Sequence, residues 1–541
     1  MTETIRDVTF GLMRELGLTT VFGNPGSTEE TFLKDFPADF RYVQTIQEAS
    51  AVAAADGYAQ ATGAPAIVNV HTAAGVSNAM SNIMTAAMNQ TPLIVTAGNQ
   101  TRDMLLMEPW LSNVQPAELP KPWVKWSYEP VRAEDVPAAL MRAYAEAVQA
   151  PAGPVFLSIP LDDWDAPATG SNPVARTVAT RVGPDPARLA EFAEVLNTAK
   201  DPALIFGAAV ARGRGWDQAV ALVEKIGVHV YAAPASEQAP FPEDHPLYVG
   251  GLPFAIGPLS QKLDGHDAAI VIGAPVFRYY PYVAGDYLPE GLRLLHVTDD
   301  PAQAARAPVG DSLIGDAVLT IEALTELVTT RPHRAVDKQP HLLAPHGPGA
   351  PACSSDERMG ADELFTTLRA ATPPETVVVS ESPSNLGEFH AAWPIVRPDS
   401  YYTFASGSLG WNLPAAVGFA LAERDSGRNR PVLAIIGDGS MQYSVQGLYT
   451  AARLELPILY VIPCNDEYAI LKSFADLEQT PGVPGLDIPG LDVVSIARGY
   501  GCHAERAETG EQVRAAVAAA ADRPGPTLLA VPIQAKVPPL L

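Results

Sequence analysis

Short apolar runs alternate with longer Ala- and Leu-rich stretches along most of the chain. The short runs have the length and β-branched content of buried parallel strands, and the longer stretches have the apolar spacing of helices. The runs that stand out are TTVFG, APAIVNV, TPLIVTAG, GPVFLSIP, PALIFGA, HVYAAP, AAIVIGA, RLLHVT, TVVVSE, PVLAIIG, PILYVIP and TLLAVPI. Regular alternation of strands and helices predicts parallel sheets covered by helices.

Two stretches interrupt this alternation. Residues 162–186 are rich in Pro, Gly, Asp and Thr, and residues 331–360 are rich in Pro and His, and neither carries a sustained apolar pattern. They divide the chain into three segments of ordinary domain size. The sequence therefore predicts an α/β protein with three doubly wound parallel-sheet domains, at residues 1–180, 181–340 and 341–541.

Composition narrows the class of protein. Hydrophobic residues make up 47% and charged residues 18% of the 541 residues, which is typical of soluble proteins with several cores. The net charge of −25 argues against nucleic acid or an anionic membrane as partner. Three separated cysteines (Cys353, Cys464 and Cys502) suit a reducing compartment. With no signal-peptide pattern and no membrane-length apolar run, we expect a cytoplasmic protein.

The first chemical signal follows the run PVLAIIG, where Asp438 lies between Gly437 and Gly439 and is followed by Ser440. Asn465 follows the next apolar run, PILYVIPC. Because the carboxyl ends of adjacent parallel strands meet at one sheet edge, we expect the Asp438 and Asn465 side chains to lie together. Glycines let backbone N–H groups approach a diphosphate, and the carboxylate can bind a metal ion that lies between it and the diphosphate.

Mg²⁺ prefers oxygen ligands and commonly combines a carboxylate, neutral oxygens and phosphate oxygens. Asp438, Asn465 and a main-chain carbonyl near Glu467 would supply the protein ligands. GDGS alone is better explained by a Gly-rich turn with an aspartate cap, but an Asn at this spacing after the following strand favours the metal site. The motif differs from a P-loop, which requires G-x-x-x-x-G-K-[ST].

This arrangement resembles the signature of the thiamine-diphosphate-dependent 2-oxo acid decarboxylase superfamily. The resemblance extends along nearly the whole chain to the benzoylformate decarboxylases of that superfamily. It rests on VFGNPGS, FLKDFPADFRY, IQEASAVAAADGYAQA, HTAAGVSNAM, PLIVTAGNQTR, PVFLSIPLDDWD, GHDAAIVIGAPVFRY, DPAQAARAPVGD, SLGWNLPAAVG and VPGLDIPGLD. The resemblance implies pyrimidine-binding, middle and diphosphate-binding domains in that order, with thiamine diphosphate and Mg²⁺ as cofactors.

The resemblance implies cofactor contacts that the pattern alone would leave structural. Glu48, at the start of an Ala-rich helix, would face N1′ of the aminopyrimidine and share a proton with it. Gly407 would accept a hydrogen bond from the 4′-amino group, and Leu409 would hold the cofactor bent. Without the family, Glu48 is an acid favoured by the helix dipole and Leu409 a core residue. Further cofactor contacts are implied for Ser384, Gly439, Ser440, Asn465 and Tyr468.

Three residues are implied to act on the substrate. His71 follows the strand AIVNV and Ser27 lies in the turn GNPGS, so both follow strand ends. The resemblance makes His71 a proton-moving or carboxylate-orienting group and Ser27 a donor to the substrate carboxylate. A packed histidine and a turn serine are the plain alternatives. Tyr280 stands where the family has a second catalytic histidine, and a phenol is a poorer proton relay at neutral pH.

Other departures from the family pattern fall among the residues expected to contact the diphosphate and the substrate. Pro383 replaces a diphosphate-binding hydroxyl, so Ser384 would carry that contact, and Ile470 replaces a small residue beside the substrate. Trp110 and Thr403 also differ from the family pattern. The predicted substrate pocket consists of Gly26, Trp110, Leu111, Ile470, Leu471 and Phe474. The departures predict a reshaped pocket that can favour smaller or aliphatic 2-oxo acids, with cofactor binding intact.

The leading function is non-oxidative decarboxylation of benzoylformate or a related phenylglyoxylate-type 2-oxo acid to an aldehyde and CO₂, with carboligase side activity. This is a carboxy-lyase reaction in which the cofactor is the electron sink and the protein supplies orientation and proton transfers. One alternative is an acetolactate-synthase-like carboligase that forms 2-hydroxyketones or hydroxy-oxo acids. Another is a silent cofactor-binding subunit, against which the retention of Glu48, His71 and Ser27 argues.

The resemblance also implies an assembly and a metabolic setting. In the family the active site lies between the first segment of one subunit and the third segment of another, so we expect a homodimer or homotetramer. Mandelate catabolism is the implied pathway. The middle segment has a Gly-rich turn, FGAAVARGRG, but lacks G-x-G-x-x-G, and we expect no FAD there.

Overall fold

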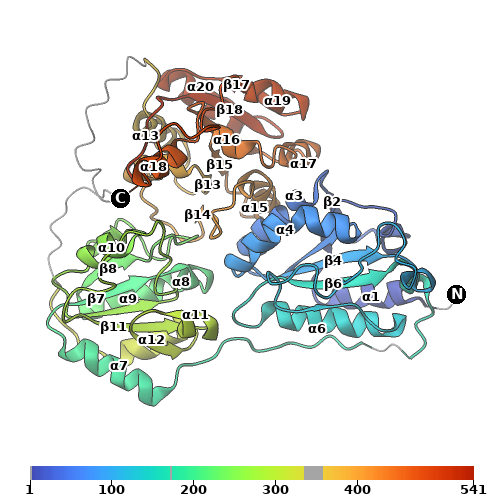
Figure 1. Cartoon of the computed structure of the whole chain (residues 1–541), viewed down its shortest axis with the longest axis horizontal. Coiled ribbons are helices and arrows are strands. Elements are labelled where there is room, and N and C mark those ends of the chain that lie inside the picture. The colour runs from blue at the N-terminus through green and yellow to red at the C-terminus, as the bar shows by residue number, and fades with distance from the viewer. Residues whose placement is uncertain (1–2, 171–172, 334–356, 541) are drawn as a thin grey trace.

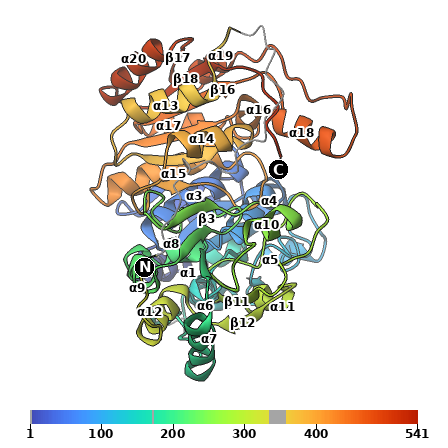
Figure 2. The same cartoon turned by 90° about the vertical axis from the view of Figure 1, so that its left-hand side faces the viewer.

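The computed structural model describes residues 3–170, 173–333 and 357–540. Three six-stranded parallel sheets form three successive α/β domains (Figure 1). The third domain lies above the other two in both Figure 1 and Figure 2. This arrangement confirms the predicted fold class. The predicted boundary at residues 340 and 341 lies outside the described residues.

The first sheet has the strand order β2-β1-β3-β4-β6-β5. Its strands are β1 (Thr20–Gly23), β2 (Arg41–Gln44), β3 (Ala66–Val70), β4 (Leu93–Asn99), β5 (Ser127–Tyr128) and β6 (Val155–Pro160). Its helices are α1 (Ile5–Glu15), α2 (Glu30–Leu33), α3 (Glu48–Thr62), α4 (Thr72–Met88), α5 (Arg102–Leu105) and α6 (Val136–Val148), with 3-10 turns at Ala133–Asp135 and Leu161–Asp165. The order reverses between β1 and β3, and ligands of doubly wound sheets bind at such a switch point.

The third sheet repeats this relative order as β14-β13-β15-β16-β18-β17. Its strands are β13 (Val377–Glu381), β14 (Tyr401–Tyr402), β15 (Val432–Ile436), β16 (Ile458–Cys464), β17 (His503–Arg506) and β18 (Thr527–Pro532). Its helices are α13 (Ala361–Ala371), α14 (Leu386–Ala392), α15 (Asn412–Asp425), α16 (Asp438–Met441), α17 (Gly447–Arg453), α18 (Ala469–Leu477), α19 (Val493–Gly499) and α20 (Gly510–Ala521), with a 3-10 turn at Pro383–Asn385. The switch point lies between β13 and β15.

The middle sheet has the order β12-β11-β10-β7-β8-β9 and reverses between β7 and β10. Its strands are β7 (Pro202–Phe206), β8 (His229–Ala232), β9 (Tyr248–Gly251), β10 (Ala268–Ile272), β11 (Arg293–Thr298) and β12 (Asp311–Ile314). Its helices are α7 (Pro186–Thr198), α8 (Ala208–Arg212), α9 (Trp216–Ile226), α10 (Ile256–Lys262), α11 (Pro301–Arg306) and α12 (Ala317–Leu327).

The apolar runs identified in the sequence form the four inner strands of each sheet, and the prediction missed the two edge strands of each sheet. The missed strands are two to four residues long, and most of their residues are partly exposed in β2 and β12. A short strand that faces solvent carries no apolar run. Within the described part of the chain, no helix has both the length and the apolarity needed to span a bilayer.

Helices α3 and α15 join the first domain to the third (Figure 1). A Cβ atom at Gly57 of α3 would lie 2.3 Å from the carbonyl oxygen of Ala415. A Cβ atom at Gly418 of α15 would lie 2.0 Å from the carbonyl oxygen of Ala54. Only glycine permits this approach, so the two helix backbones are in direct contact where the domains meet.

Replacement of Gly418 by alanine should destabilise the protein, because the new methyl group would overlap the Ala54 carbonyl. Overpacking of this kind costs about 1–3 kcal/mol. Thermal unfolding followed by circular dichroism should therefore show a lower Tm. Gly11→Ala in α1 is the control, since a Cβ there meets nothing within 4 Å and alanine is the better helix former. A Gly418→Ala protein with unchanged Tm would contradict the packing.

Candidate functional site

His71 and Ser27 follow β3 and β1, the strands that flank the first switch point. The Nδ1 atom of His71 lies 2.8 Å from the Glu29 carboxylate and 3.2 Å from the Thr28 hydroxyl. Gly26 lies under the imidazole, where a Cβ atom would come within 2.1 Å of Nδ1. The turn is therefore shaped to hold the ring of His71, while Ser27 is exposed at the same edge.

Glu29 is a functional candidate that sequence reasoning missed. Its side chain has no exposed surface and accepts hydrogen bonds from the N–H groups of Gly26 at 3.0 Å and Gly98 at 2.7 Å. The hydrogen bond to Glu29 raises the pKa of His71, against a smaller lowering by burial. An acid in the turn after β1, beside the lone histidine after the neighbouring strand, is a signal that could have identified the pair.

Glu48 is the first residue of α3 and is 7% exposed. Its two carboxylate oxygens accept hydrogen bonds from the side-chain amides of Asn24 at 3.0 Å and Asn78 at 3.1 Å. Both donors are neutral, and each carboxylate oxygen keeps a lone pair for a further donor. Gly75 packs against the side chain, since a Cβ there would lie 3.3 Å from Cγ of Glu48. The carboxylate is fixed in position and able to accept another hydrogen bond.

Asp438 and Asn465 follow the paired strands β15 and β16, as predicted. The Asp438 carboxylate accepts the N–H of Asp466 at 2.9 Å, which brings the GDGS turn against the segment after β16. Burial raises the pKa of Asp438 to about 6, and the side chain is 3% exposed. Among the described residues, the Asn465 side-chain oxygen accepts one long hydrogen bond of 3.3 Å, from the Glu467 N–H.

The other predicted diphosphate contacts surround this turn. A Cβ atom at Gly439 would lie 2.5 Å from the Tyr468 ring, and Ser440 is buried behind it. The hydroxyl of Ser384 accepts the Ile470 N–H at 3.1 Å. The structure therefore brings the predicted residues of the third domain into one neighbourhood. The Oε2 atom of Glu467 forms an ion pair with Lys472, and its Oε1 atom is buried without a hydrogen-bond partner. The predicted metal ligand at this residue is its main-chain carbonyl.

The segment that carries Gly407 and Leu409 leads into α15. The buried Glu381 carboxylate accepts the N–H groups of Gly410 at 2.7 Å and Trp411 at 3.0 Å. Its main-chain carbonyl accepts the N–H of Gly437 at 3.2 Å. Burial raises the pKa of Glu381 to about 7, against the lowering effect of the backbone hydrogen bonds. One residue thus connects the predicted pyrimidine-facing segment to the predicted metal turn.

These residues fit thiamine diphosphate with a divalent ion. A Cβ atom at Gly439 would collide with the Tyr468 ring, so glycine is required for Tyr468 to pack against the turn. The oxygen donors are a buried carboxylate, a side-chain amide and a main-chain carbonyl, which is the ligand chemistry of Mg²⁺. The described residues contain no cluster of three His, Cys, Asp or Glu, so phosphate oxygens would have to complete the shell.

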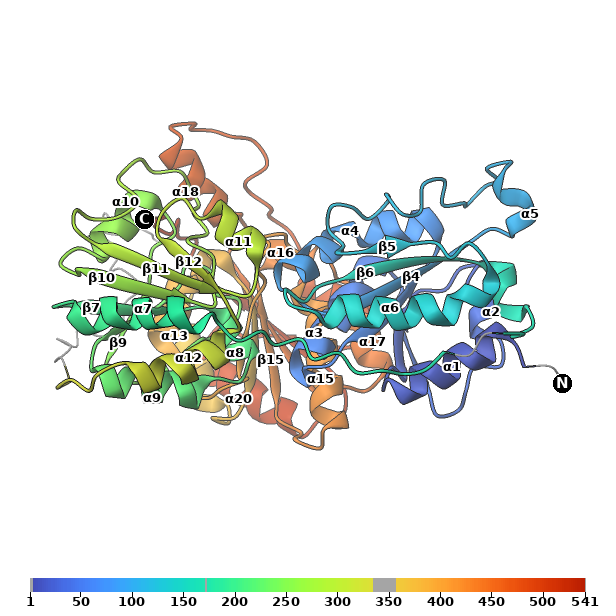
Figure 3. The same ribbon diagram turned by 90° about the horizontal axis from the view of Figure 1, so that it is seen from below.

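The predicted substrate wall is divided in the single chain. Trp110 is 92% exposed and Leu111 is 49% exposed in the segment after α5. Tyr280 packs against Phe474 of α18 with the rings tilted by 39° and their centroids 4.9 Å apart. Figure 3 shows α5 at the right-hand end of the molecule and α18 in its left half. One chain therefore joins Tyr280 to α18, but it does not bring Trp110 and Leu111 to them.

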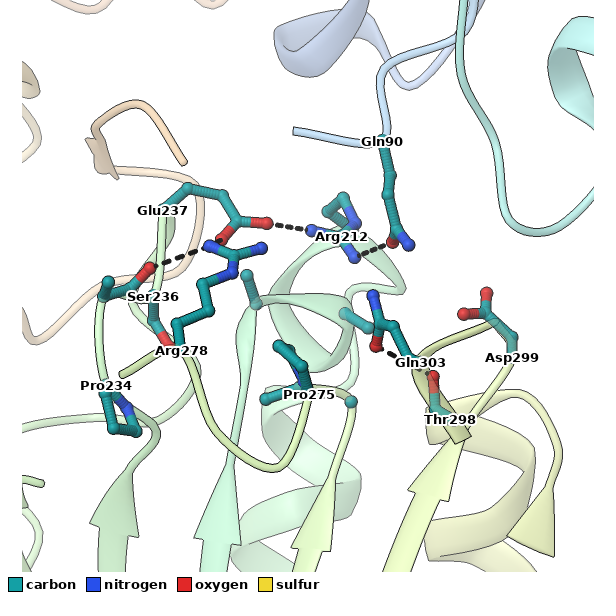
Figure 4. Close-up of a pocket in the computed structure, with 15 residues that line it drawn as sticks. Gln90, Arg212, Pro234, Ser236, Glu237, Pro275, Arg278, Thr298, Asp299 and Gln303 are labelled. Atoms are coloured by element: carbon teal, nitrogen blue, oxygen red, sulfur yellow. Dashed lines mark hydrogen bonds and ion pairs between the residues drawn. The ribbon is translucent and has the colours of Figure 1, made fainter. Parts of the chain in front are cut away.

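A separate small pocket lies at the carboxyl edge of the middle sheet (Figure 4). Arg212 and Arg278 both pair with the buried Glu237 carboxylate, and Arg212 also donates to Gln90 of the first domain. The cavity volume is about 20 Å³, which is room for about one water molecule. A dinucleotide would have to displace these ion pairs, and the absence of FAD stays a prediction. None of the predicted site residues lines this pocket.

The thiamine pyrophosphate enzyme models match the chain in three places. The N-terminal TPP binding domain matches residues 3–117, the central domain residues 189–324, and the C-terminal TPP binding domain residues 385–531. Benzoylformate decarboxylase from Pseudomonas aeruginosa is 44% identical over 98% of this chain and 99% of its own length.

Two solved structures have the same fold. Benzoylformate decarboxylase from Polynucleobacter necessarius is 50% identical, with a TM-score of 0.93 over 99% of this chain and all of its own. The thiamine diphosphate-dependent 4-hydroxybenzoylformate decarboxylase from Rhodococcus jostii is 40% identical, with a TM-score of 0.91 and the same coverage. The chain therefore belongs to the thiamine pyrophosphate enzyme family, and within it to the group that includes the benzoylformate decarboxylases.

Proposed function

We propose that this chain catalyses the non-oxidative decarboxylation of benzoylformate or a related aryl 2-oxo acid to an aldehyde and CO₂, with thiamine diphosphate and Mg²⁺. The observation that carries the proposal is the buried Asp438 carboxylate, which follows β15 at the switch point of the third sheet, with Asn465 after the neighbouring strand. Its hydrogen-bond partners among the described residues are backbone N–H groups, so a cation would compensate its buried charge. The relatives named above support the substrate class.

The bound cofactor supplies the electron sink that accepts the electrons of the departing carboxylate. Asp438, Asn465 and the Glu467 carbonyl would hold the metal ion, and Ser384, Gly439, Ser440 and Tyr468 would line the diphosphate. Glu48 would hold a proton at N1′ of the aminopyrimidine, Gly407 would accept a hydrogen bond from its 4′-amino group, and Leu409 would pack against the cofactor. These assignments rest on the family resemblance and, for Glu48, Asp438, Ser440 and Asn465, also on burial.

On the substrate side, Ser27 donates to the carboxylate of the 2-oxo acid. The Glu29 carboxylate accepts the Nδ1–H of His71, which leaves Nε2 free to hold or move a proton. The hydroxyl of Tyr280, whose side chain is exposed and packs against Phe474, donates a hydrogen bond to the substrate. A phenol is a weaker relay than an imidazole, which favours some carboligation of the product aldehyde as a side reaction.

We further propose that two copies of the chain form each active site. Trp110 and Leu111 would reach the α18 side of a second copy, where Tyr280 is 67% exposed and Leu471 is 44% exposed. Both surfaces are apolar, and burial of such surfaces drives association. A homodimer or homotetramer follows. The domain boundaries 1–180, 181–340 and 341–541, a cytoplasmic location and a role in mandelate catabolism remain parts of the same proposal.

CO₂ release from a panel of aryl and aliphatic 2-oxo acids tests the substrate class. We expect benzoylformate-type acids to be decarboxylated only when both Mg²⁺ and thiamine diphosphate are present. The aliphatic members test the effect of Ile470, whose larger side chain reduces the space beside the substrate. Release from aliphatic acids alone would reject the aryl substrate, and 2-hydroxyketone as the main product would favour the carboligase.

Asp438→Asn should weaken thiamine diphosphate binding by at least about tenfold, because the metal ion loses a charged ligand. Calorimetric titration of the cofactor in the presence of Mg²⁺ measures this directly. Asp466→Asn is a matched control, because the Asp466 side chain faces Arg358 while only its N–H contacts Asp438. Equal affinities in the wild type and in Asp438→Asn would refute the metal site.

Glu29→Gln should move the His71-dependent limb of the pH–rate profile to lower pH. The reason is that the Glu29 carboxylate raises the pKa of His71, and a neutral amide does not stabilise the imidazolium. The shift has the same sign whether His71 acts as acid or as base. Thr28→Val removes the other Nδ1 contact without changing charge and should shift the limb less. An unmoved midpoint in Glu29→Gln would show that Glu29 does not tune His71.

A further inference from the structure

Asp56 is a buried carboxylate that the proposed reaction does not use. It lies on α3, has no exposed surface, and contacts both the first and the third domains. One carboxylate oxygen accepts the indole N–H of Trp411 at 2.7 Å and the side-chain amide of Asn89 at 2.8 Å. The other accepts the side-chain amide of Gln60 at 2.9 Å. Burial of a carboxylate among neutral donors costs folding free energy, and a cost of this kind points to a role other than stability.

The face of α4 beside Asp56 is polar although it is buried. Asn82, Thr85 and Asn89 are spaced by three and four residues, so they lie on one face, and they are 2%, 0% and 1% exposed. This face contacts the segment 405–411 of the third domain. Asn89 accepts the N–H of Ala405 at 2.9 Å, and the Thr85 and Ser406 hydroxyls are 2.8 Å apart.

Contacts with the first domain therefore hold both ends of this segment. Asn89 holds Ala405 at its start, and Asp56 holds the Trp411 side chain at its end. Asn89 also donates to Asp56, so the two anchors are joined to each other. Within its own domain, the segment is fixed by the Glu381 carboxylate, which accepts the backbone N–H of Trp411. Trp411 is thus bonded to a buried acid from each domain.

We propose that Asp56 and the polar face of α4 position the segment 405–411 for the cofactor, so that Asp56 is a positioning residue of the reaction. The segment contains Gly407 and Leu409, whose cofactor contacts belong to the proposed function, on which this inference rests. Gly407 has a φ of +71°, and a Cβ atom there would meet nothing within 4 Å. Contacts at both ends of the segment, rather than packing around Gly407, set the direction of its carbonyl.

Hydrogen–deuterium exchange of the cofactor-free protein tests the anchor. Trp411→Phe keeps the aromatic packing and removes only the indole N–H that donates to Asp56. Asp56→Ala removes the carboxylate that accepts hydrogen bonds from both Trp411 and Asn89. Both variants should exchange the amides of 405–411 at least about tenfold faster, the effect of losing a hydrogen bond to a charged group. Gln60→Ala is the matched control, because it removes the donor on the other carboxylate oxygen and should leave this exchange within about twofold.

The affinity for thiamine diphosphate distinguishes a positioning role of Asp56 from a role only in holding the first and third domains together. In Trp411→Phe, titration with thiamine diphosphate and Mg²⁺ should give a Kd at least about tenfold weaker, while the KM for the 2-oxo acid changes less. Unchanged exchange in Trp411→Phe would overturn the anchor. Faster exchange with unchanged cofactor affinity would overturn the positioning role and leave the proposed function intact. Failure of the wild type to bind thiamine diphosphate would instead reject the proposed function.

Discussion

The direct contact of α3 with α15 is the constraint on which the rest of the site depends. Gly57 and Gly418 let the two helix backbones touch, and this contact fixes the first domain against the third. Helix α3 begins at Glu48, so the same packing that joins the domains also directs that carboxylate. Two turns further along α3, Asp56 reaches Trp411 at the start of α15. One rigid helix pair therefore carries both the predicted cofactor acid and the anchor of the predicted cofactor segment, which in the proposed two-chain arrangement serve two different sites.

Buried acids without basic partners distinguish the site from the rest of the core. Glu48, Asp56, Glu381 and Asp438 accept their described hydrogen bonds from amide, indole or backbone N–H groups. Elsewhere, a buried acid such as Glu237 is paired with two arginines. Neutral donors compensate a buried charge only in part, which raises the free energy of the folded state. A cationic cofactor and a divalent ion would supply the missing positive charge.

The sequence predicted the inner part of every sheet and the part of the site that lies at strand ends. Asp438 and Asn465 could be placed together because both follow apolar runs that had to be neighbouring inner strands. The edge strands, such as β2, were missed because half-exposed strands of a few residues leave no apolar run. Glu29 and Asp56 were missed for different reasons. Glu29 and His71 follow neighbouring strands, a signal that the prediction did not use. Asp56 and Trp411 are far apart in the sequence and neither follows a strand end, so only the folded chain shows that they face each other.

The central claim is that Glu48 of one chain and Asp438 of another act on the same cofactor. Subunit mixing tests it directly: Glu48→Gln and Asp438→Asn proteins, each inactive alone, are combined and allowed to exchange subunits. In a mixed dimer, one site would contain both substitutions and the other would be intact. Random mixing should then restore about a quarter of the wild-type decarboxylase activity. If both residues of a site came from the same chain, mixed dimers confirmed by mass spectrometry would stay inactive, and that result would contradict the account.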